Sequence, residues 1–303
     1  NTITTVITVV GGIDGCYNLS STAGGLDEED DTSLRWRIAN RWAGTTIGTE
    51  DGYENIVFSQ SGVEDAVVVG HGNTGRSDFG SVDIYVKGQV PRFKNDSYSS
   101  LTAFYYDIVF TKQPVISNST TAVQSSNVGV ISSSNWSLVK DTGVYGGSIS
   151  GQDTLHWVVP QSGSGSLYVS YSYNGLIEDL QNLFSKTNKD ILDTSILIRE
   201  AVAIPIDITC SIKIISGFDS VTVISLITTE IADLFSGLRI GEGIQQSDVA
   251  HTILNTPGVD DLQLPFTVFR SSDYSVMPDS FYDLVIPARS YASSGTITIN
   301  VTV

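Results

Sequence analysis

A long stretch without any helical period, residues 91–174, most constrains what this chain of 303 residues can fold into. It is rich in Ser, Thr, Gly, Asn and aromatic residues, and turn clusters separate short segments such as NWSLV, TLHWVV and SLYVSYSY. Regularly spaced short strands are typical of a small all-β domain. Because helical patterns lie on both sides of it, we predict that this stretch is an inserted all-β domain.

The chain before the insert combines strand patterns with helix patterns. It predicts, in order, a strand over 1–10, a helix over 26–44, a helix from the cap Thr49 to Gly62, and strands over 63–69 and 81–87. The helix over 26–44 places its acidic residues before its arginines, which is the polarity that a helix dipole favours. We therefore expect residues 1–90 to form an α+β segment.

Helix and strand patterns also fill the chain after the insert. They predict a helix over 176–184, one or two strands over 196–215 with an edge or break at Pro205, a helix over 219–237 that Gly237 caps, a helix that Ser247 caps and Pro257-Gly258 ends, and a strand over 259–268. In the longest helix, Val221, Ile224, Ile227, Ile231 and Leu234 recur at the spacing of one apolar face.

The segments after the insert thus form an α+β unit over 175–268 and a β-rich tail over 269–303 that ends in TITINVTV. The fold class is α+β and multidomain.

Charge excludes several classes of protein. The chain has 33 acidic and 16 basic residues, a net charge of −17, yet only 16% of its residues are charged, against roughly 25% in ordinary domains. Its 41% apolar content excludes a disordered chain. The acidity argues against nucleic acid as a partner, because that binding depends on Lys and Arg. No apolar run reaches the roughly 18 residues of a membrane span. Cys16 and Cys210 are interpreted as two buried thiols, with a disulfide as the alternative.

No motif for catalysis, for a cofactor or for a metal stands out. Gly70, Gly72 and Gly75 match G-x-G-x-x-G, but the residues that follow re-enter a strand, which favours a hairpin loop over a nucleotide site. His71, His156 and His251 lie far apart in sequence and no local pattern favours a Ser-His-Asp triad. The acidic run over 27–31 lacks the spacing of a calcium loop and fits a solvated helix start. We expect no enzyme and no cofactor.

The insert offers a second functional hypothesis. Its aromatic side chains could stack on sugar rings, which would make the chain a carbohydrate- or receptor-binding adhesin module, although packing in a core or interface is the commoner use of such residues. They are Tyr98, Phe104, Tyr105, Tyr106, Trp136, Trp157, Tyr168, Tyr171 and Tyr173.

The order of several segments resembles the baseplate J-like (wedge) proteins of contractile-tailed bacteriophages. They are GGLDEEDDTSLRWRI, GTEDGYENIVFSQSGVEDAVVV and VDIYVKG before the insert, and YSYNGLIEDLQNLFSK, DILDTSILIREAVAIPIDITCSIKIISGFD, LRIGEGIQQSDVAHTIL and NTPGVDDLQLP after it. The resemblance covers roughly 11–88 and 168–266. The residues of this chain that match the family's structural motifs are Gly24, Gly25, Asp27, Glu28, Arg35, Arg37, Gly241, Ser247, Asp248, Pro257, Gly258 and Val259.

The resemblance implies a non-enzymatic structural subunit of a baseplate wedge. In that family, copies link through their C-terminal α+β regions into a ring around the tail hub and rearrange when the sheath contracts. The expected partners are copies of the chain itself and other wedge, hub and sheath-proximal subunits. The expected location is the tail baseplate of the virion, after assembly in the host cytoplasm. Members usually have a further N-terminal region, so we expect this chain to be part of a longer protein.

The low charged fraction fits this implication. Charged groups are costly to desolvate, so surface that packs against other subunits is expected to be Ser-, Thr-, Asn- and Gly-rich. The acidic residues should then lie mainly on exposed rims.

Overall fold

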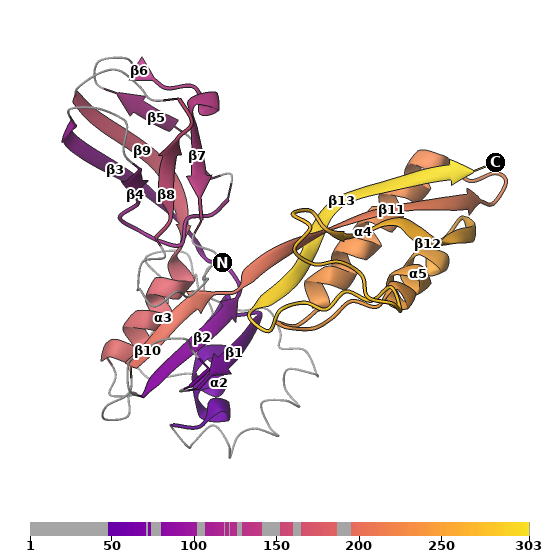
Figure 1. Cartoon of the computed structure of the whole chain (residues 1–303), viewed down its shortest axis with the longest axis horizontal. Helices are drawn as coiled ribbons and strands as arrows, with labels where there is room; N and C mark the ends of the chain where they lie inside the picture. Colours follow the sequence, from indigo (N-terminus) through magenta and orange to yellow (C-terminus); the bar gives the residue numbers. More distant parts are fainter. Residues whose placement is uncertain are drawn as a thin grey trace, which may run out of the picture.

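The described parts of the chain form three bodies, shown in Figure 1. The computed structural model describes residues 48–70, 72–73, 80–101, 107–117, 119–120, 122–125, 129–140, 152–159, 165–186 and 195–302. The strand expected over 1–10 and the helix expected over 26–44 lie outside these residues. The described elements mix helices and sheets, which confirms the α+β class.

The first body, here called the middle body, is a sheet covered on one face by two helices. Its strands β1 (Asp65–Val69), β2 (Ser81–Lys87) and β10 (Ser195–Glu200) lie in the order β1-β2-β10. β1 is antiparallel to β2, whereas β10 is parallel to it. Helices α2 (Glu50–Phe58) and α3 (Gly175–Lys186) pack on the face that carries Ile84 and Val86.

Two predictions about this body can be compared with the structure. The antiparallel pairing of β1 with β2 confirms that the glycine motif follows a strand into a hairpin. Thr49 caps α2 as expected, because its Oγ1 accepts a hydrogen bond from the Gly52 amide at 3.1 Å. The end of that helix is a correction, since it stops at Phe58. Gly62, with φ of 91°, instead lies in the turn that leads into β1.

The second body is the insert, which leaves the middle body after β2 and returns at α3. Its strands are β3 (Pro91–Leu101), β4 (Ile108–Val109), β5 (Ala122–Ser125), β6 (Gly129–Val130), β7 (Trp136–Val139), β8 (Thr154–Trp157) and β9 (Gly165–Asn174), with a 3-10 turn η2 at Ser133–Asn135. They form the sheets β3-β9-β5-β6 and β4-β8-β7. Pro91 pairs with Asn174, so the two ends of the insert lie side by side.

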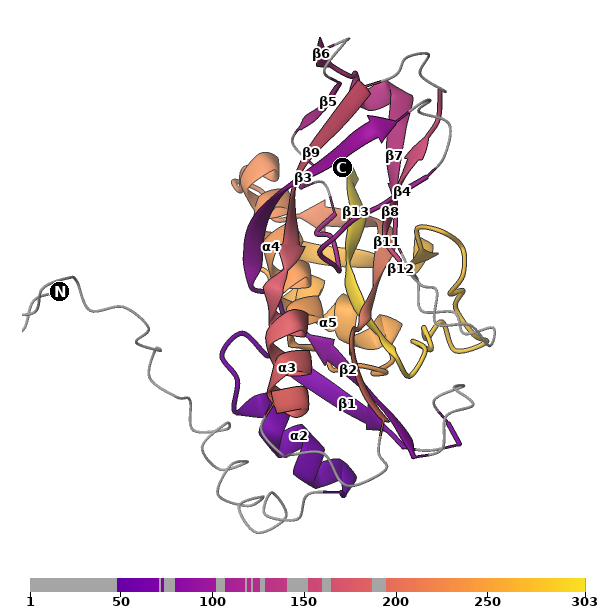
Figure 2. The same cartoon turned by 90° about the vertical axis from the view of Figure 1, so that its left-hand side faces the viewer.

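The third body, the C-terminal body, is a three-stranded sheet with two helices. Its strands β11 (Val202–Ile214), β12 (Val259–Ser271) and β13 (Ser290–Thr302) lie in the order β12-β11-β13. β11 is antiparallel to β12 and parallel to β13. Side chains from α4 (Ser220–Gly237) and α5 (Gln246–Asn255) form one core with the sheet. Figure 2 shows both helices beside this sheet.

The buried face of α4 differs from the predicted one. Ile227 and Ile231 are buried as expected, but Val223 and Phe235 complete the stripe, and Val221 is 73% exposed. Gly237 is the last helical residue and is not among the glycines with positive φ, so it is not a left-handed cap; Leu238 follows it in an extended conformation. Lys87 of the middle body binds carbonyl groups at this helix end.

Two further predictions, on Pro205 and Ser247, are corrected. β10 and β11 are separated only by Ala201, and Pro205 lies inside β11, which is a central strand. Proline is tolerated there because pairing with β12 begins one residue later, at Ile206. Ser247 lies in the first turn of α5 and Gln245 precedes the helix, without a side-chain cap. Leu254, near the end of this helix, is exposed.

Strand pairing also bears on how the chain divides. β13, from the segment expected to be a tail over 269–303, shares a sheet with β11, and β10 lies in the sheet of β1 and β2. We therefore propose a division into 48–90 with 175–200, 91–174, and 202–302, in place of the four consecutive segments.

One described helix, α4, is long and apolar enough to cross a membrane by length and composition. In the structure Val223, Ile227, Ile231 and Phe235 of this helix are buried against the sheet. A helix packed into a protein core meets the same criterion.

Candidate functional site: the two junctions of the middle body

The residues that match the family motifs fall into two groups. Gly24, Gly25, Asp27, Glu28, Arg35 and Arg37 lie outside the described residues, as do Cys16, His71, Gly75 and the acidic run over 27–31. The other motif residues lie in the C-terminal body, at opposite ends of its sheet. Gly241, with φ of 77°, donates its amide to the Ser290 carbonyl at the start of β13.

Gly258 and Val259 lie at the other end of that sheet, beside Ile214 and Ile215. Gly258 has φ of 97°, and its carbonyl accepts a hydrogen bond from the Ile215 amide at 2.9 Å. A Cβ atom there would lie 2.7 Å from Phe218 and 2.8 Å from Val223, so the packing requires glycine. Val259 is buried and pairs with Ile214. Ser247 and Asp248 lie in the first turn of α5, at the other end of that helix. Gly258 and Val259 shape the turn after α5, and the described motif residues converge on no reacting group.

The described histidines and cysteine are separate from one another. His156 in β8 contacts Asp107 at 2.7 Å, and His251 in α5 contacts Asn255 at 2.8 Å; both pairs are exposed. Cys210 is a buried free thiol in β11, and burial raises its pKa to about 11. Nothing in these contacts brings a nucleophile to a base.

Most described aromatic residues of the insert lie in its core. Trp157, Tyr171 and Tyr173 are buried, and Tyr98 and Trp136 pack partly against them. Phe93 and Tyr168 are exposed, at 63% and 47%, on the sheet of β3 and β9. A stacking surface for a sugar would therefore depend on those two among the described side chains.

The first junction joins the middle body to the C-terminal body through Lys87. This side chain is only 6% exposed, and its Nζ donates to the carbonyl oxygens of Ser236 at 2.6 Å and Leu238 at 2.9 Å. A cation at the carboxyl end of a helix satisfies carbonyl groups that have no partner within the helix and interacts favourably with its dipole. The same Nζ lies 5.3 Å from the ring centre of Tyr291 in β13. Lys87 thus supplies the cap of α4 from another body.

Asp65 binds the chain just beyond that helix end. Its carboxylate accepts hydrogen bonds from the Ile240 amide at 2.7 Å and from the Arg239 guanidinium at 3.4 Å. Asp65 is also buried, and it is the direct cross-strand partner of Lys87. One pair on neighbouring strands therefore holds residues 236–240 through opposite charges.

Apolar and aromatic contacts complete this junction. Tyr85, Ala201 and Ile240 are buried together, with Val67, Val69 and Tyr291 packed around them. The Arg289 guanidinium lies 5.4 Å from the ring centre of Tyr85 and donates to the Asn73 carbonyl. Burial raises the pKa of the Tyr85 hydroxyl. Since β10 continues into β11 after one residue, the two bodies are joined by covalent chain, charge and packing together.

The second junction, between the insert and the middle body, centres on Asn174. This side chain is fully buried, and its Oδ1 accepts from the amides of Val90 at 3.0 Å and Leu176 at 3.2 Å. Its Nδ2 donates to the Gly88 carbonyl at 2.9 Å and to Glu200 at 3.1 Å. One residue thus connects the segment between β2 and β3, the end of β10 and the start of α3.

Ion pairs surround that residue on the same junction. Arg92 contacts Asp179 at 2.6 Å and Lys140 contacts Glu200 at 2.8 Å. Lys112 pairs with Glu178, which also accepts from the Tyr173 hydroxyl at 3.1 Å. The hydrogen bond from Lys112 lowers the pKa of the Glu178 carboxyl. Surface ion pairs contribute little singly, so the buried amide of Asn174 is the stronger contact.

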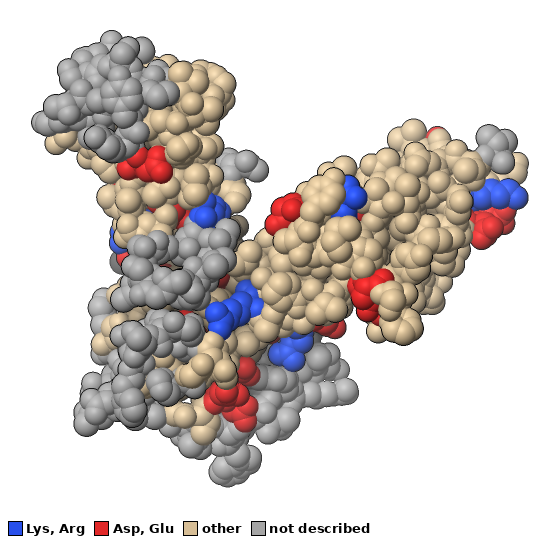
Figure 3. Space-filling view, viewed as in Figure 1, with Lys and Arg blue, Asp and Glu red and all other residues tan. Residues whose placement is uncertain are grey.

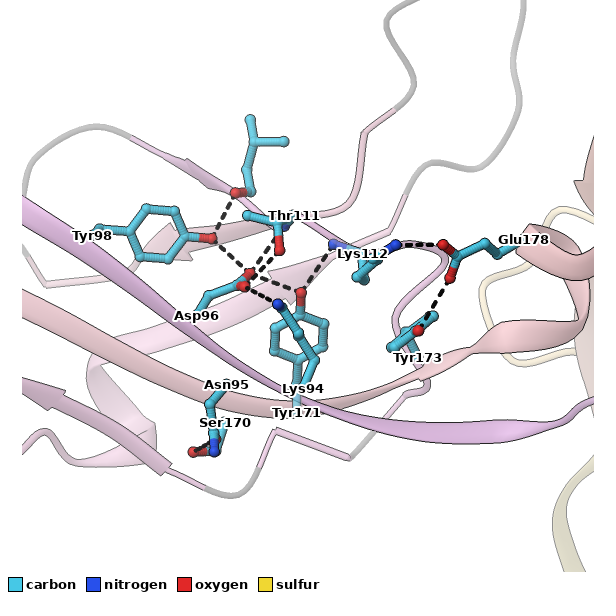
Figure 4. A network of polar contacts seen from close by, with 11 residues as sticks. Lys94, Asn95, Asp96, Tyr98, Thr111, Lys112, Ser170, Tyr171, Tyr173 and Glu178 are labelled. Carbon is cyan, nitrogen blue, oxygen red and sulfur yellow. Dashed lines mark hydrogen bonds and ion pairs between the residues drawn. The ribbon is translucent and has the colours of Figure 1, made fainter. Parts of the chain in front are cut away.

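A buried carboxylate organises the part of the insert next to this junction (Figure 4). Asp96 in β3 accepts hydrogen bonds from Thr111, both amide and hydroxyl, and from the hydroxyls of Tyr171 at 2.7 Å and Tyr98 at 3.1 Å. Burial opposes ionisation of Asp96, but these hydrogen bonds outweigh it and lower the pKa of the carboxyl. Burial and the hydrogen bond to Asp96 raise the pKa of the Tyr171 hydroxyl to about 12. The network ties the two sheets of the insert together.

The residues of both junctions were not singled out from the sequence. A weak signal existed for Asn174, because Asn directly before a helix is a preferred cap. Lys87 ends the alternating strand SVDIYVK, but nothing in the sequence connects it with Ser236. Charged side chains are sparse on the face of the C-terminal body seen in Figure 3.

The comparisons with known proteins address this C-terminal body. Residues 206–300 match the family model described as Baseplate J-like protein C-terminal domain. A search of curated proteins finds no match for the chain. The matched range runs from β11 through α4, α5 and β12 into β13, so it covers nearly all of the body that Lys87 and Asp65 hold. The match confirms the resemblance to baseplate J-like proteins within residues 206–300, which are similar to the C-terminal domain of that family.

Proposed function

We propose that this protein is a structural subunit of the baseplate wedge of a contractile phage tail. A baseplate J-like domain indicates a structural protein of the phage baseplate. In the finer proposal, copies of the chain contact one another and other wedge, hub and sheath-proximal subunits in a ring around the tail hub. The location would be the virion tail, with assembly in the host cytoplasm.

The observation that carries the proposal is the match over residues 206–300, which falls on one structural body. The junctions support it, because a subunit that transmits force between neighbours needs its bodies fixed to each other. Lys87 and Asp65 fix the C-terminal body, and Asn174 fixes the insert. Rearrangement on contraction would then change the contacts between subunits and not those within one subunit. Such a switch requires interfaces with two alternative arrangements.

Purified tail particles give the first test. We expect the chain in every particle, in about six or twelve copies as a ring implies. Quantitative mass spectrometry against sheath and tube proteins measures the number. Particles that contain sheath and tube but lack this chain would contradict the proposal.

The adhesin hypothesis remains the second candidate, supported by the exposed Phe93 and Tyr168. The ends of the insert are adjacent, at Pro91 and Asn174, so a short glycine linker can replace residues 91–173 while Asn174 is kept. A wedge subunit with this deletion should still assemble into tails. An adhesin should assemble but lose adsorption to host cells, and Phe93→Ser with Tyr168→Ser should reproduce that loss.

A further inference from the structure

The second junction brings an amine, a carboxylate and a carboxamide together. Lys140 follows β7 in the insert, Asn174 ends β9, and Glu200 ends β10 in the middle body. Glu200 contacts both of the others, because its Oε2 accepts from the Lys140 Nζ at 2.8 Å and its Oε1 accepts from the Asn174 Nδ2 at 3.1 Å. One carboxylate therefore holds the amine beside the carboxamide.

The carboxamide of Asn174 is bound as a reacting acyl group is bound in an oxyanion hole. Its Oδ1 accepts hydrogen bonds from the backbone amides of Val90 at 3.0 Å and Leu176 at 3.2 Å. Two amides that point at one carbonyl oxygen stabilise the negative charge that develops there when a nucleophile attacks the carbon. Asn174 is fully buried, and such electrostatic contacts are stronger away from water.

The amine has the freedom to reach this carbonyl carbon. The side chains of Lys140 and Glu200 are mostly buried, at 30% and 23% exposed. A lysine amine ends a flexible stem of four carbons. Because the Lys140 Nζ and the Asn174 Nδ2 bind the two oxygens of one carboxylate, rotation of that stem carries Nζ to Cγ of Asn174. We propose that Lys140 and Asn174 form an isopeptide bond, with Glu200 as the group that carries protons between them.

The reaction needs no oxidant, reductant or co-reactant. Glu200 takes a proton from the Lys140 ammonium, and the neutral Nζ attacks Cγ of Asn174. In the tetrahedral intermediate the negative charge lies on Oδ1, which faces the amides of Val90 and Leu176. Glu200 passes its proton to Nδ2, the carbonyl forms again, and the bond from Cγ to Nδ2 breaks. The remaining extra proton on Nζ leaves through Glu200 with the ammonia, so one ammonium ion is released and the chain loses one positive charge.

The glycine after Asn174 is the competing nucleophile. A backbone amide that follows asparagine can attack the side-chain carboxamide to form a succinimide, which also releases one ammonia. In the structure the Gly175 amide donates to the Val90 carbonyl at 2.9 Å, so it is already engaged elsewhere. The contacts therefore favour Lys140 as the nucleophile, and the experiment must separate the two products.

The bond would join the two sheets of the insert where they meet the middle body. β7 belongs to the sheet β4-β8-β7, whereas β9 belongs to the sheet β3-β9-β5-β6. A covalent bond between the end of each strand would prevent the sheets from separating at this junction. The inference is independent of the proposed function, since a wedge subunit and an adhesin would both gain from a fixed insert.

Mass spectrometry of the full chain tests the inference. We expect the intact chain to be lighter than its sequence by one ammonia molecule. Trypsin should fail to cleave after Lys140, because the amine is no longer free, and should yield one peptide over residues 113–186 that contains the bond. A chain with the full mass of its sequence overturns the inference, and so does complete cleavage after Lys140.

Variants separate the isopeptide bond from a succinimide. Lys140→Arg should restore the full mass, whereas a succinimide at Asn174 would still form. Glu200→Gln should slow bond formation at least about a hundredfold, followed by intact mass at successive times after synthesis. The matched control is Lys112→Arg, because Lys112 pairs with Glu178 at the same junction but that carboxylate contacts a tyrosine hydroxyl in place of an amide. The control should lose ammonia as the unaltered chain does. Loss of ammonia that persists in Lys140→Arg overturns the inference, as does an unchanged rate in Glu200→Gln.

Discussion

Asp65 and Lys87 are direct cross-strand partners on β1 and β2, and each binds a different part of the chain that leaves α4. Lys87 donates to the Ser236 and Leu238 carbonyls, while Asp65 accepts from the Ile240 amide. The pair places a positive charge at the Leu238 carbonyl and a negative charge at the Ile240 amide, two residues further along the chain. The carboxyl end of α4 is therefore held from outside its own body.

Replacing Lys87 with methionine tests how much this contact contributes. Lys87→Met keeps the apolar stem but removes two charge-assisted hydrogen bonds, and we expect a loss of about 2 kcal/mol in the free energy of unfolding. Amides over 236–242 should also exchange faster with solvent. The matched control is Lys213→Met, since Lys213 pairs with Asp260 on the surface and should change stability by less than about 0.5 kcal/mol. Equal effects of the two variants would contradict a special role for Lys87.

The buried amide of Asn174 gives a prediction for the second junction. Asn174→Ala leaves two amides and a carbonyl without a partner inside the protein, so we expect a loss of about 2–4 kcal/mol, measured by thermal unfolding. Asn255→Ala is the control, because Asn255 is exposed and contacts only the neighbouring His251 side chain among its described hydrogen bonds. Similar melting temperatures for the two variants would show that water replaces the amide of Asn174.

Local patterns were enough to predict most of the described elements. Thr49 begins α2 as its side chain chemistry requires, and the alternation in VDIYVK gives β2. Both signals depend only on residues close together in the sequence, so they can be recognised from the sequence alone. The end of α4 shows the opposite case: Gly237 is a good cap in isolation, but Lys87, about 150 residues away, performs that role.

Besides two helix ends, the predictions that needed correction depend on tertiary neighbours. Val221 and Val223 both fit an apolar stripe, and only the position of the sheet decides that Val223 is buried. Pro205 suggests an edge, yet the central strand β11 accommodates it because β12 pairs only from Ile206 onward. Asp65 and Lys87 were missed for the same reason, since their partners lie in another body.

Acid should weaken the insert through Asp96. Its folded-state pKa is lowered, so the ionised carboxylate contributes stability above the unfolded value of 3.8, and that contribution is lost as pH falls through the lower folded value. Asp96→Asn should therefore cost about 1–3 kcal/mol near neutral pH and flatten the dependence of stability on pH below about 4. Thermal unfolding between pH 3 and 7 measures both. Tyr168→Phe, on an exposed ring outside the network, should leave the profile unchanged.

Two glycines of the C-terminal body should respond in opposite directions to the same substitution. Gly258 has a positive φ and its Cβ would overlap Phe218 and Val223, so Gly258→Ala should destabilise the chain by about 1–3 kcal/mol. Gly237 lies in the last turn of α4 with open space around it, so Gly237→Ala should stabilise by about 0.5–1 kcal/mol. Chemical denaturation of both variants measures the difference. A gain at Gly258 would mean that the turn after α5 relaxes without loss, and that this glycine does not shape the far end of the sheet.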